Sequence, residues 1–380
     1  MKRKLQKIGY FCLISSMIVF IGFFVIMFVH RRDIVRRNSF DNLQQKAEKV
    51  ILCIGDGMGE NHIEIGKKYL NQKMIFESFD YQGYMTTFSN AIFSPTDSAA
   101  AATAMATGQK VNNGEISKHK NENLLTISEY AKSLNKGIGI VTTDSLAGAT
   151  PACFSSHAKS RDDVEDIING QINSGIDLFL GAGYTDYLPY QNQLENKQYL
   201  FTNQFDQLSM HAEKVFGCFK EIVNYQHQND TPTLVNLVAF AINFMESKYP
   251  EGYFLMIEAA HIDKMSHQNE IFKMIEYLDE FNHAIQYAYE KLSKNTNTAF
   301  IVTADHETGN LPHFTGTKEE INNKLYRRKN HSRKKVKFFL QFPFDVDSST
   351  IPSKIDNTDI YNICCLLYTS PSPRDRQKSR

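Results

Sequence analysis

The sequence predicts an α/β protein built on a sheet whose strands are mostly parallel. Short apolar runs alternate with segments of helical periodicity along most of the chain, which is the pattern of strand–helix–strand units. Five of these runs have the character of buried strands, at residues 50–54, 138–141, 178–180, 253–257 and 299–302. The 380 residues, 42% of them hydrophobic, suffice for one large domain with an insertion or for two ordinary domains.

Two segments between these strands carry clear helix signals. Residues 99–107 are rich in alanine, the strongest helix former. A second helix is expected to start at Thr231, with Pro232 in its first turn, and to continue to Met245. Residues 184–230 are rich in Tyr, Asn and Gln and have weaker periodicity, so we expect a peripheral insertion that lies over the sheet.

The N-terminus carries an uncharged run of 21 residues, 9–29. A helix of that length crosses the roughly 30 Å hydrocarbon core of a bilayer. The residues after the run make a poor cleavage site, which favours an uncleaved signal anchor over residues 1–32 rather than a cleaved signal peptide. Basic residues flank the run on both sides, so charge does not set its orientation. We therefore expect a juxtamembrane linker at 33–49, the folded domain at 50–368, and a tail at 369–380 that is disordered or not native.

The charge balance argues against a general nucleic-acid-binding protein. The chain has 42 basic and 42 acidic residues, whereas such proteins are usually basic overall. The six cysteines include no CxxC pair and give no sign of a disulfide framework. Neither observation excludes a local site for anions.

Acidic residues end three of the predicted strands. Asp56, Glu258 and the pair Asp305-His306 each come at or just after the end of a strand. In open α/β sheets, ligands bind beyond the carboxyl ends of the strands. Each acid alone would be an ordinary helix N-cap or loop residue, but three at one edge would repel one another without a cation among them. The sequence therefore predicts bound metal ions at this edge of the sheet.

Asp263 and His267, four residues apart, add a second carboxylate–imidazole pair. On a helix this spacing puts both side chains on one face, where they could share a metal ion. Nitrogen and oxygen ligands of this kind suit zinc, whereas carboxylates, a hydroxyl and waters suit magnesium. Without the neighbouring acids, a surface pair would be the simpler interpretation.

Ser98 is the candidate nucleophile. It begins the alanine-rich helix, where backbone N–H groups and the helix dipole favour an anion. A serine needs a base or a metal ion to become a nucleophile. No GxSxG turn surrounds it, so activation by a metal ion is favoured over a Ser-His-Asp triad. Considered alone, Ser98 would be a plain N-cap residue.

Five sequence blocks, in order along residues 50–310, resemble those of the alkaline phosphatases. The blocks are IGDGMG at 54–59, TDSAAAATA at 96–104, ATPACFSSHAKSR at 149–161, IEAAHIDKMSH at 257–267 and TADHETGN at 303–310. The resemblance implies a large, mostly parallel central sheet with helices on both faces. It also implies a hydrolase of phosphate monoesters that carries two zinc ions and one magnesium ion.

The same resemblance implies the ligands of the three ions. The first zinc ion would be bound by Asp263, His267 and a histidine near the C-terminus. The second zinc ion, which would activate Ser98, would be bound by Asp56, Asp305 and His306. Magnesium would be bound by Asp56, Thr150 and Glu258. Arg161 would hold the phosphate, since its planar guanidinium can bind two oxygens at once.

Four positions depart from the family pattern or add to it. The C-terminal zinc ligand would be His331, although Ser332 and Arg333 follow it where the family usually has Thr or Ser and then Gly, and His313 is the rival. Gly148 stands where the family usually has Asp or His, which would loosen the magnesium site. Lys264 would contact phosphate through water. The basic segment 324–337 is either a solvated loop or a means of drawing anionic substrates to the site.

We therefore expect a two-step phosphoryl transfer through Ser98 on small phosphate monoesters, with activity that rises at alkaline pH. The domain would lie outside the cytoplasm, in the periplasm or outside the cell, held to the membrane by its N-terminal helix. The sequence does not settle the oligomeric state, although the resemblance makes a homodimer one option because the family is commonly dimeric. Two alternatives remain open. One is a related metalloenzyme that acts on phosphodiesters or sulfate esters. The other is an inactive metal-binding membrane scaffold, which Gly148 and the divergent segment around His331 favour and the complete set of other site residues disfavours.

Overall fold

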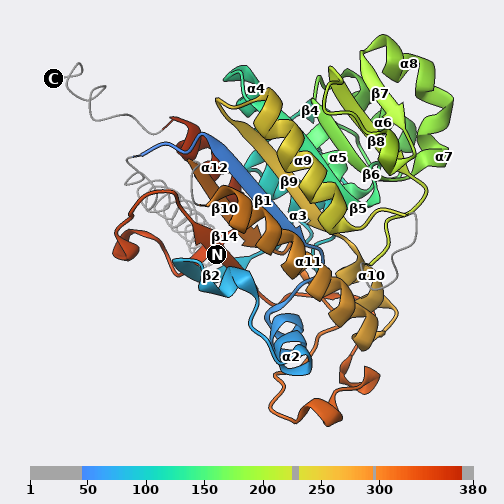
Figure 1. Cartoon of the computed structure of the whole chain (residues 1–380). Helices are drawn as coiled ribbons and strands as arrows, with labels where there is room; N and C mark the ends of the chain where they lie inside the picture. Colours follow the sequence, from blue (N-terminus) through green and yellow to red (C-terminus); the bar gives the residue numbers. More distant parts are fainter. Residues whose placement is uncertain (1–44, 225–230, 294–296, 370–380) are drawn as a thin grey trace, which may run out of the picture.

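A ten-stranded sheet runs through the centre of the computed structural model, which describes residues 45–224, 231–293 and 297–369 (Figure 1). In sheet order the strands are β14 (Lys354–Asp356), β2 (Tyr81–Thr86), β13 (Val336–Gln341), β10 (Thr298–Thr303), β1 (Lys49–Gly55), β9 (Tyr253–Ala259), β5 (Gly137–Ser145), β6 (Leu178–Ala182), β8 (Lys214–Phe219) and β7 (Tyr199–Thr202). Among these strands, β13 alone runs antiparallel to its neighbours. The predicted mostly parallel sheet is thus confirmed.

The five strands predicted from the sequence form the middle of this sheet. They are β10, β1, β9, β5 and β6, and they lie side by side. Strands β1, β9 and β10 are buried along their whole length, because helices cover both faces of the sheet. That double burial explains why their sequences are continuously apolar and do not alternate.

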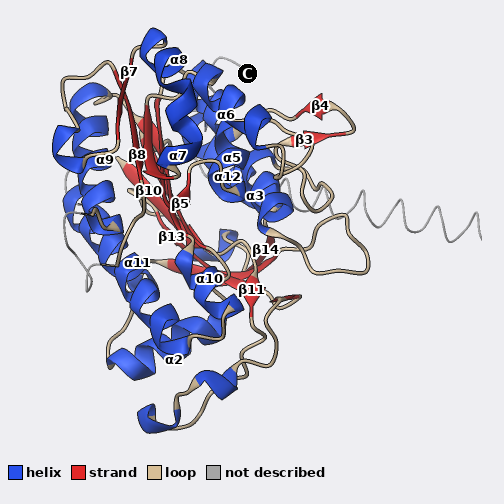
Figure 2. Cartoon of the chain, turned by 90° about the vertical axis from the view of Figure 1, so that its right-hand side faces the viewer, coloured by secondary structure: helices blue, strands red, loops and turns tan. Residues whose placement is uncertain are grey.

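Helices lie on both faces of the sheet, as Figure 2 shows when the sheet is seen nearly edge-on. One face is covered by α9 (Leu234–Lys248) and α11 (Ile271–Leu292). The opposite face is covered by α3 (Ser98–Thr107), α4 (Ile127–Ser133), α5 (Ala149–Ser155), α6 (Val164–Asn173) and α12 (Thr358–Thr369). The remaining helices are α2 (Glu60–Leu70), α7 (Tyr184–Tyr187), α8 (Gln191–Asn196) and α10 (His261–His267). Two short two-stranded sheets complete the fold, β3 (Lys118–His119) with β4 (Glu122–Asn123), and β11 (Glu307–Thr308) with β12 (His331–Ser332).

Two sequence predictions need correction. Residues 184–230 do not simply lie over the sheet, because they contribute β7 and β8, which pair in parallel with each other and with β6 and extend the sheet at its edge. The helix expected from Thr231 begins instead at Leu234. The Thr233 side chain accepts a hydrogen bond from the Asn236 N–H, and the Asn236 side chain accepts one from the Thr233 N–H, so this capping box fixes the start after Pro232.

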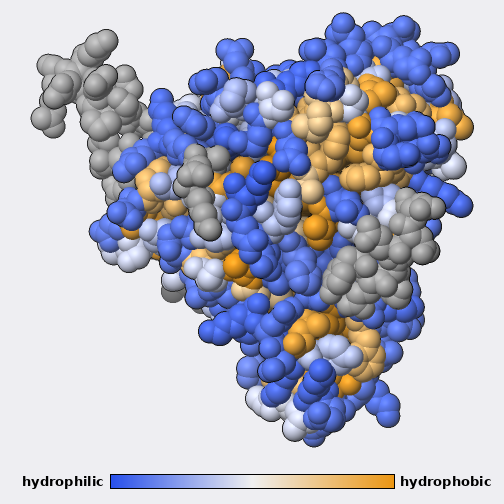
Figure 3. Space-filling view, in the orientation of Figure 1, coloured by the Kyte–Doolittle hydropathy of each residue, from blue (hydrophilic) through white to orange (hydrophobic). Residues whose placement is uncertain are grey.

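The predicted membrane anchor at residues 1–32 lies outside the described residues, as do most of the linker at 33–49 and residues 370–380 of the tail. Of the helices described between residues 45 and 369, none is both long enough and apolar enough to cross a bilayer. The face seen in Figure 3 is mostly hydrophilic, with hydrophobic residues gathered over α9. The apolar core lies between the sheet and its two helical layers.

Candidate active site

The acidic residues predicted to meet at one sheet edge do meet there. Strands β10, β1 and β9 are neighbours, and their registers align Ile54 of β1 with both Thr303 and Glu258. The chain beyond β1 and β10 therefore places Asp56 and the pair Asp305-His306 beside one another. Glu258 lies one residue before the end of β9.

Asp56, Asp305 and His306 form a fully buried group, which we call the inner cluster. The Nε2 atom of His306 lies 3.4 Å from Asp56 Oδ1 and 3.2 Å from Asp305 Oδ2. Neither of those carboxylate oxygens has a hydrogen-bond partner among the described residues. Burial raises the pKa of Asp56 well above its usual range, and the carboxylates around it raise it further. A cation between the three side chains would remove this cost.

Thr308 orients the imidazole of His306. Thr308 of β11 donates its hydroxyl hydrogen to Asp263 Oδ1, so its oxygen is free to accept from His306 Nδ1, 3.3 Å away. With Nδ1 donating to Thr308, Nε2 is the nitrogen left to bind a metal ion beside the two carboxylates.

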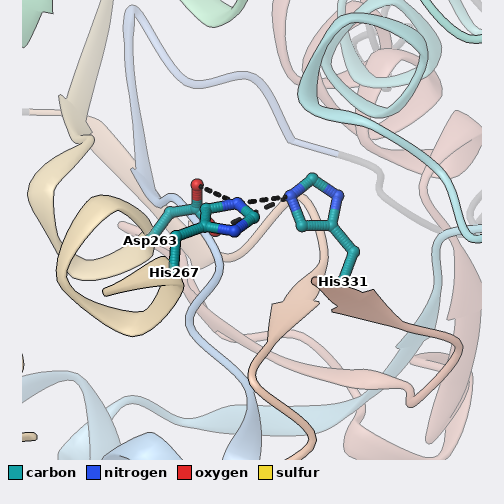
Figure 4. Close-up of side chains that lie close together, drawn as sticks. All are labelled: Asp263, His267 and His331. Atoms are coloured by element: carbon teal, nitrogen blue, oxygen red, sulfur yellow. Dashed lines mark hydrogen bonds and ion pairs between the residues drawn. The ribbon is translucent and has the colours of Figure 1, made fainter. Parts of the chain in front are cut away.

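A second group, which we call the outer cluster, consists of Asp263, His267 and His331 (Figure 4). Asp263 and His267 lie one turn apart on α10, with His267 Nε2 3.2 Å from Asp263 Oδ2. His331 comes from β12, where pairing with β11 sets it opposite Thr308. Its Nε2 lies 3.0 Å from Nε2 of His267 and 3.8 Å from Asp263 Oδ1. The structure thus brings His331 to the site, while His313 lies beside Arg327 and Lys334 in a surface hollow.

Both imidazoles of the outer cluster are held through Nδ1. His331 Nδ1 donates to the carbonyl oxygen of Thr96 at 2.9 Å, and His267 Nδ1 donates to the carbonyl oxygen of Lys329. A carbonyl can only accept, so each ring donates from Nδ1, and the two Nε2 atoms face each other beside Asp263. Burial, and then the neighbouring His306, lowers the pKa of His331 to about 4, which keeps this ring neutral. The bond to Asp263 raises the pKa of His267. Two neighbouring Nε2 atoms beside a carboxylate fit a bound zinc ion.

Gly57 allows the two clusters to lie so close together. Its φ of +68° is in the left-handed region, and a Cβ at this position would lie 2.6 Å from Asp263 Oδ1. Its N–H donates to Asp305 Oδ1 at 3.0 Å. A glycine is therefore required both by the backbone conformation and by the approach of the outer cluster.

Ser98 is the first residue of α3 and is buried beside the inner cluster. Its Oγ lies 3.1 Å from His306 Nε2. The N-cap residue Asp97 accepts from the Ala100 N–H at 2.9 Å and fixes the start of the helix. Arg161 follows α5 in a loop, and its Nη1 lies 3.7 Å from Asp97 Oδ2. Asp97 thus places the partly exposed guanidinium of Arg161 near the helix end that carries Ser98.

A third group of ligands surrounds Glu258. Burial raises the pKa of Glu258 to about 8, although a hydrogen bond from Thr142 lowers it in part. Thr150, the second residue of α5, is buried, and its Oγ1 has no hydrogen-bond partner among the described residues. Asp305 contributes to the raised pKa of both Asp56 and Glu258, and Glu258 contributes to that of Asp56, which places the acids in one electrostatic environment. An orphaned hydroxyl and two buried carboxylates suit a hard cation such as magnesium.

Sequence reasoning missed the residues that orient these ligands. Thr308 donates a hydrogen bond to Asp263, and Thr142 donates one to Glu258. The carbonyl oxygens of two backbone positions, Thr96 and Lys329, accept from the two outer imidazoles. The threonines stand within or near the matched blocks and could have been suspected. A backbone carbonyl leaves no trace in the sequence.

Comparisons with known proteins agree with this geometry. The family model described as Alkaline phosphatase matches residues 47–206 and 190–369. Alkaline phosphatase 4 of Bacillus subtilis is 32% identical over 291 residues, which cover 70% of this chain and 63% of that protein. Alkaline phosphatase of Schizosaccharomyces pombe is 30% identical over 307 residues, covering 70% of this chain and 57% of that protein. The chain thus spans less than two thirds of the length of these relatives.

Solved structures give the same result. The alkaline phosphatase of the Antarctic bacterium TAB5 is 26% identical and matches with a TM-score of 0.76, covering 86% of this chain and all of that one. A variant of that enzyme, 25% identical with a TM-score of 0.75 over 85% of this chain and 98% of that one, has magnesium bound in a site named M3. With five matched blocks, the shared sheet and the two ligand clusters in place, the chain belongs to the alkaline phosphatase family.

Proposed function

We propose that this protein hydrolyses phosphate monoesters, with Ser98 as the nucleophile. The observation that carries the proposal is the position of Ser98 Oγ, 3.1 Å from an inner-cluster imidazole and at the N-terminus of α3. The outer cluster lies next to the inner cluster, because Thr308 and Gly57 each contact residues of both clusters. A nucleophile, an anion-binding helix end and two metal sites together are what phosphoryl transfer requires.

The ligands divide among three ions. The outer cluster would hold one zinc ion and the inner cluster a second, because each offers imidazole Nε2 lone pairs together with carboxylate oxygens. Asp56, Thr150 and Glu258 would hold magnesium through oxygen alone. The unpartnered oxygens of Asp56, Thr150 and Asp305 fit this division, since each would face an ion. The magnesium seen in the TAB5 variant supports the third site. When bound, these ions lower the pKa of hydroxyl groups and water and neutralise charge on the reacting oxygens.

The protein residues then account for the reaction steps. Ser98 Oγ attacks phosphorus, and its bond to phosphorus forms as the bond to the leaving oxygen breaks. The Ser98 N–H, which belongs to the first turn of α3 and has no partner within the helix, and the guanidinium of Arg161 hold the non-bridging oxygens as their charge grows. Water next breaks the bond between phosphorus and Oγ, which releases inorganic phosphate and restores the serine hydroxyl.

Arg161 favours monoesters over diesters and sulfate esters. A monoester presents three non-bridging oxygens that share two negative charges, and a planar guanidinium can bind two of them at once. A diester or a sulfate ester carries one negative charge fewer. We therefore expect p-nitrophenyl phosphate to react faster than bis-p-nitrophenyl phosphate or p-nitrophenyl sulfate.

The purified full-length chain should hydrolyse p-nitrophenyl phosphate faster at pH 10 than at pH 7, in the presence of zinc and magnesium. A chelator should abolish this activity, and Ser98→Ala should reduce it by at least about 10³-fold. The exposed Ser133, on α4, provides a matched control, and Ser133→Ala should leave the rate unchanged. Folded, metal-loaded protein without activity would support the scaffold alternative. Faster turnover of the diester or the sulfate would show that the substrate class is not the monoesters. Full activity in Ser98→Ala would show that Ser98 is not the nucleophile.

We also propose that residues 1–32 hold the domain to a membrane on its outer side and that the domain forms a homodimer. The uncharged run at 9–29 supports the first proposal. Cleavage of the domain by protease added to cells stripped of any outer membrane, with the inner membrane intact, tests the location, and light scattering of the purified protein tests the dimer. A domain protected in such cells would contradict the first proposal, and a monomer at micromolar concentration would contradict the second.

A further inference from the structure

A carboxylate from another position in the chain lies beside Gly148. Gly148 is the N-cap of α5, two residues before Thr150. A Cβ at Gly148 would lie 3.3 Å from Oδ2 of Asp144 and 2.8 Å from the carbonyl oxygen of Ser145. The carboxylate of Asp144 thus adjoins the space that a side chain at 148 would enter. Asp144 lies near the end of β5, at the same sheet edge as the site.

The other carboxylate oxygen of Asp144 fixes a lysine. Asp144 Oδ1 accepts from Lys264 Nζ and from the Ser145 N–H at 2.7 Å. Lys264 directly follows Asp263 on α10, so its ammonium group is tied to the segment that carries two outer-cluster ligands. Both side chains are partly exposed, 41% for Lys264 and 31% for Asp144, as expected for groups that line an open site.

Asp144 also orients the ligands around Glu258. The Asp144 N–H donates to Thr142 Oγ1 at 2.9 Å, and Thr142 in turn donates to Glu258 Oε2. Because Thr142 Oγ1 already accepts from Asp144, its own hydrogen is directed to Glu258. The charge of Asp144 also contributes, after burial and the Thr142 bond, to the pKa of Glu258, so the two carboxylates lie within electrostatic reach.

We propose that Asp144 is a positioning residue for both the magnesium site and the phosphate site, in place of a side chain at 148. Three protein ligands would leave positions on a bound magnesium ion to water, and those waters would need acceptors. Asp144 Oδ2, beside Gly148, would be such an acceptor, and Oδ1 would hold Lys264 where it meets phosphate. The expectation that Gly148 loosens the magnesium site would then be wrong, because the missing side chain is replaced. This inference rests on the proposed function.

The first test is magnesium affinity, measured by isothermal titration of the zinc-loaded full-length protein. Asp144→Asn and Asp144→Ala should weaken binding by about 10- to 100-fold, the usual effect of losing a partner of metal-bound groups. Zinc content and the thermal midpoint of the zinc-loaded protein should not change. Asp206, exposed on the 3₁₀ turn Phe205–Gln207 beside β7, provides a matched control as Asp206→Asn.

The second test asks whether Asp144 acts through Lys264. Asp144→Ala and Lys264→Ala should each weaken inhibition by inorganic phosphate. The double variant should lose no more of this inhibition than Lys264→Ala loses alone. Additive effects would overturn this part of the proposal. Unchanged magnesium affinity in Asp144→Asn, while the parent binds magnesium, would overturn the first part and leave the proposed function intact. A parent protein that binds zinc but no magnesium would overturn the metal assignment and this inference together.

Discussion

The inner and outer clusters use the same residue types in opposite ways. The inner cluster has two carboxylates and one imidazole, it lies at the ends of β1 and β10, and all three residues are buried. The outer cluster has one carboxylate and two imidazoles, and its residues come from the short helix α10 and the two-residue strand β12. The side chains of His267 and His331 are 37% and 16% exposed. One cluster is thus part of the core, and the other is partly exposed to solvent.

This difference predicts a difference in metal affinity and exchange. Without an ion, the inner cluster leaves two neighbouring carboxylates in a buried position, which is costly. The outer cluster has a single carboxylate, which His267 can pair with when no ion is bound, and both imidazoles keep their bonds to backbone carbonyls. We therefore expect the inner ion to be held more tightly and to exchange more slowly than the outer one.

The largest effect should follow from Asp305→Asn in the inner cluster. Asparagine keeps the oxygen that accepts from the N–H groups of Gly57 and His306, at 3.0 and 2.9 Å, so the backbone should stay in place. It replaces the buried Oδ2 with an amide nitrogen that cannot bind a metal ion. We expect one tightly held zinc ion fewer per chain and a fall in kcat/KM of at least about 10³-fold, several kcal/mol of lost stabilisation.

Atomic emission of the purified protein measures the metal content, and hydrolysis of p-nitrophenyl phosphate measures the rate. Asp206→Asn again serves as the charge-matched control. Millimolar zinc in the assay should not restore the Asp305→Asn rate. If it did, the inner ion would be no tighter than the outer one, and the contrast between the clusters would fail.

A smaller and reversible effect is expected from His331→Gln in the outer cluster. The change removes one Nε2 ligand from a partly exposed site and leaves Asp263 and His267 in place. We expect zinc affinity and activity at trace zinc to fall by about 10²-fold, and added zinc to restore most of the activity. Titration of the activity with buffered free zinc gives the apparent affinity.

His313→Gln is the control for this experiment, since His313 was the rival ligand in the sequence and lies apart from the cluster. It should behave as the parent protein does at every zinc concentration. If His313→Gln needed added zinc and His331→Gln did not, His313 and not His331 would be the zinc ligand.

The sequence predicted the inner cluster better than the outer one for a physical reason. Asp56, Asp305 and His306 stand at strand ends, and adjacent parallel strands bring their ends together whatever the rest of the chain does. His331 is separated from Asp263 by 68 residues and reaches it through a two-residue strand pair. No periodicity in the sequence encodes so short a pairing, so only the family resemblance pointed to it.

The remaining errors have similar causes. Strand β7 is an edge strand of the sheet and is only half buried, so its sequence is less distinctive than that of a buried strand. Strand β8 lies between β6 and β7 and is buried, but Gly217 and Cys218 interrupt its apolar run. The role of Asp144 was missed because it replaces a residue four positions along the chain, and only the folded backbone shows that the two positions share one space.

A third imidazole–carboxylate pair, His157 with Glu129, shows what happens without a metal site. His157 Nδ1 lies 2.7 Å from the carbonyl oxygen of Ser117, and Nε2 lies 2.9 Å from Glu129 Oε1. Both nitrogens face acceptors, so the ring can satisfy both only as an imidazolium ion. In the outer cluster, His267 has a similar arrangement, but its Nε2 also lies 3.0 Å from Nε2 of His331, so two rings share one carboxylate. The second imidazole, and not the carboxylate, therefore distinguishes the metal cluster from the charged pair.

The smallest effect should come from His157→Gln, and it should depend on pH and not on metal. Burial lowers the pKa of His157, but its bonds to Glu129 and Ser117 outweigh this and raise it above the usual value. Burial likewise raises the pKa of Glu129, and the bond to His157 outweighs it and lowers the value. A raised histidine pKa stabilises the folded state fully below about pH 6.5 and ceases to do so as the pH rises through the folded-state value. A lowered glutamate pKa stabilises it above about pH 4.3 and ceases to do so as the pH falls.

The variant should therefore lose the most stability between about pH 5 and pH 6.5, and the loss should shrink toward pH 9. We expect less than about 1 kcal/mol, because the Glu129 side chain is 45% exposed and solvent screens the pair. Urea unfolding of parent and variant at pH 5.5 and 9, with and without chelator, measures the difference, and His211→Gln, at an exposed histidine, should show none. A chelator should lower the stability of both proteins equally and leave their difference unchanged. If the chelator removed the difference, His157 would belong with the metal ligands, and a second facing imidazole would not be what separates the two kinds of histidine.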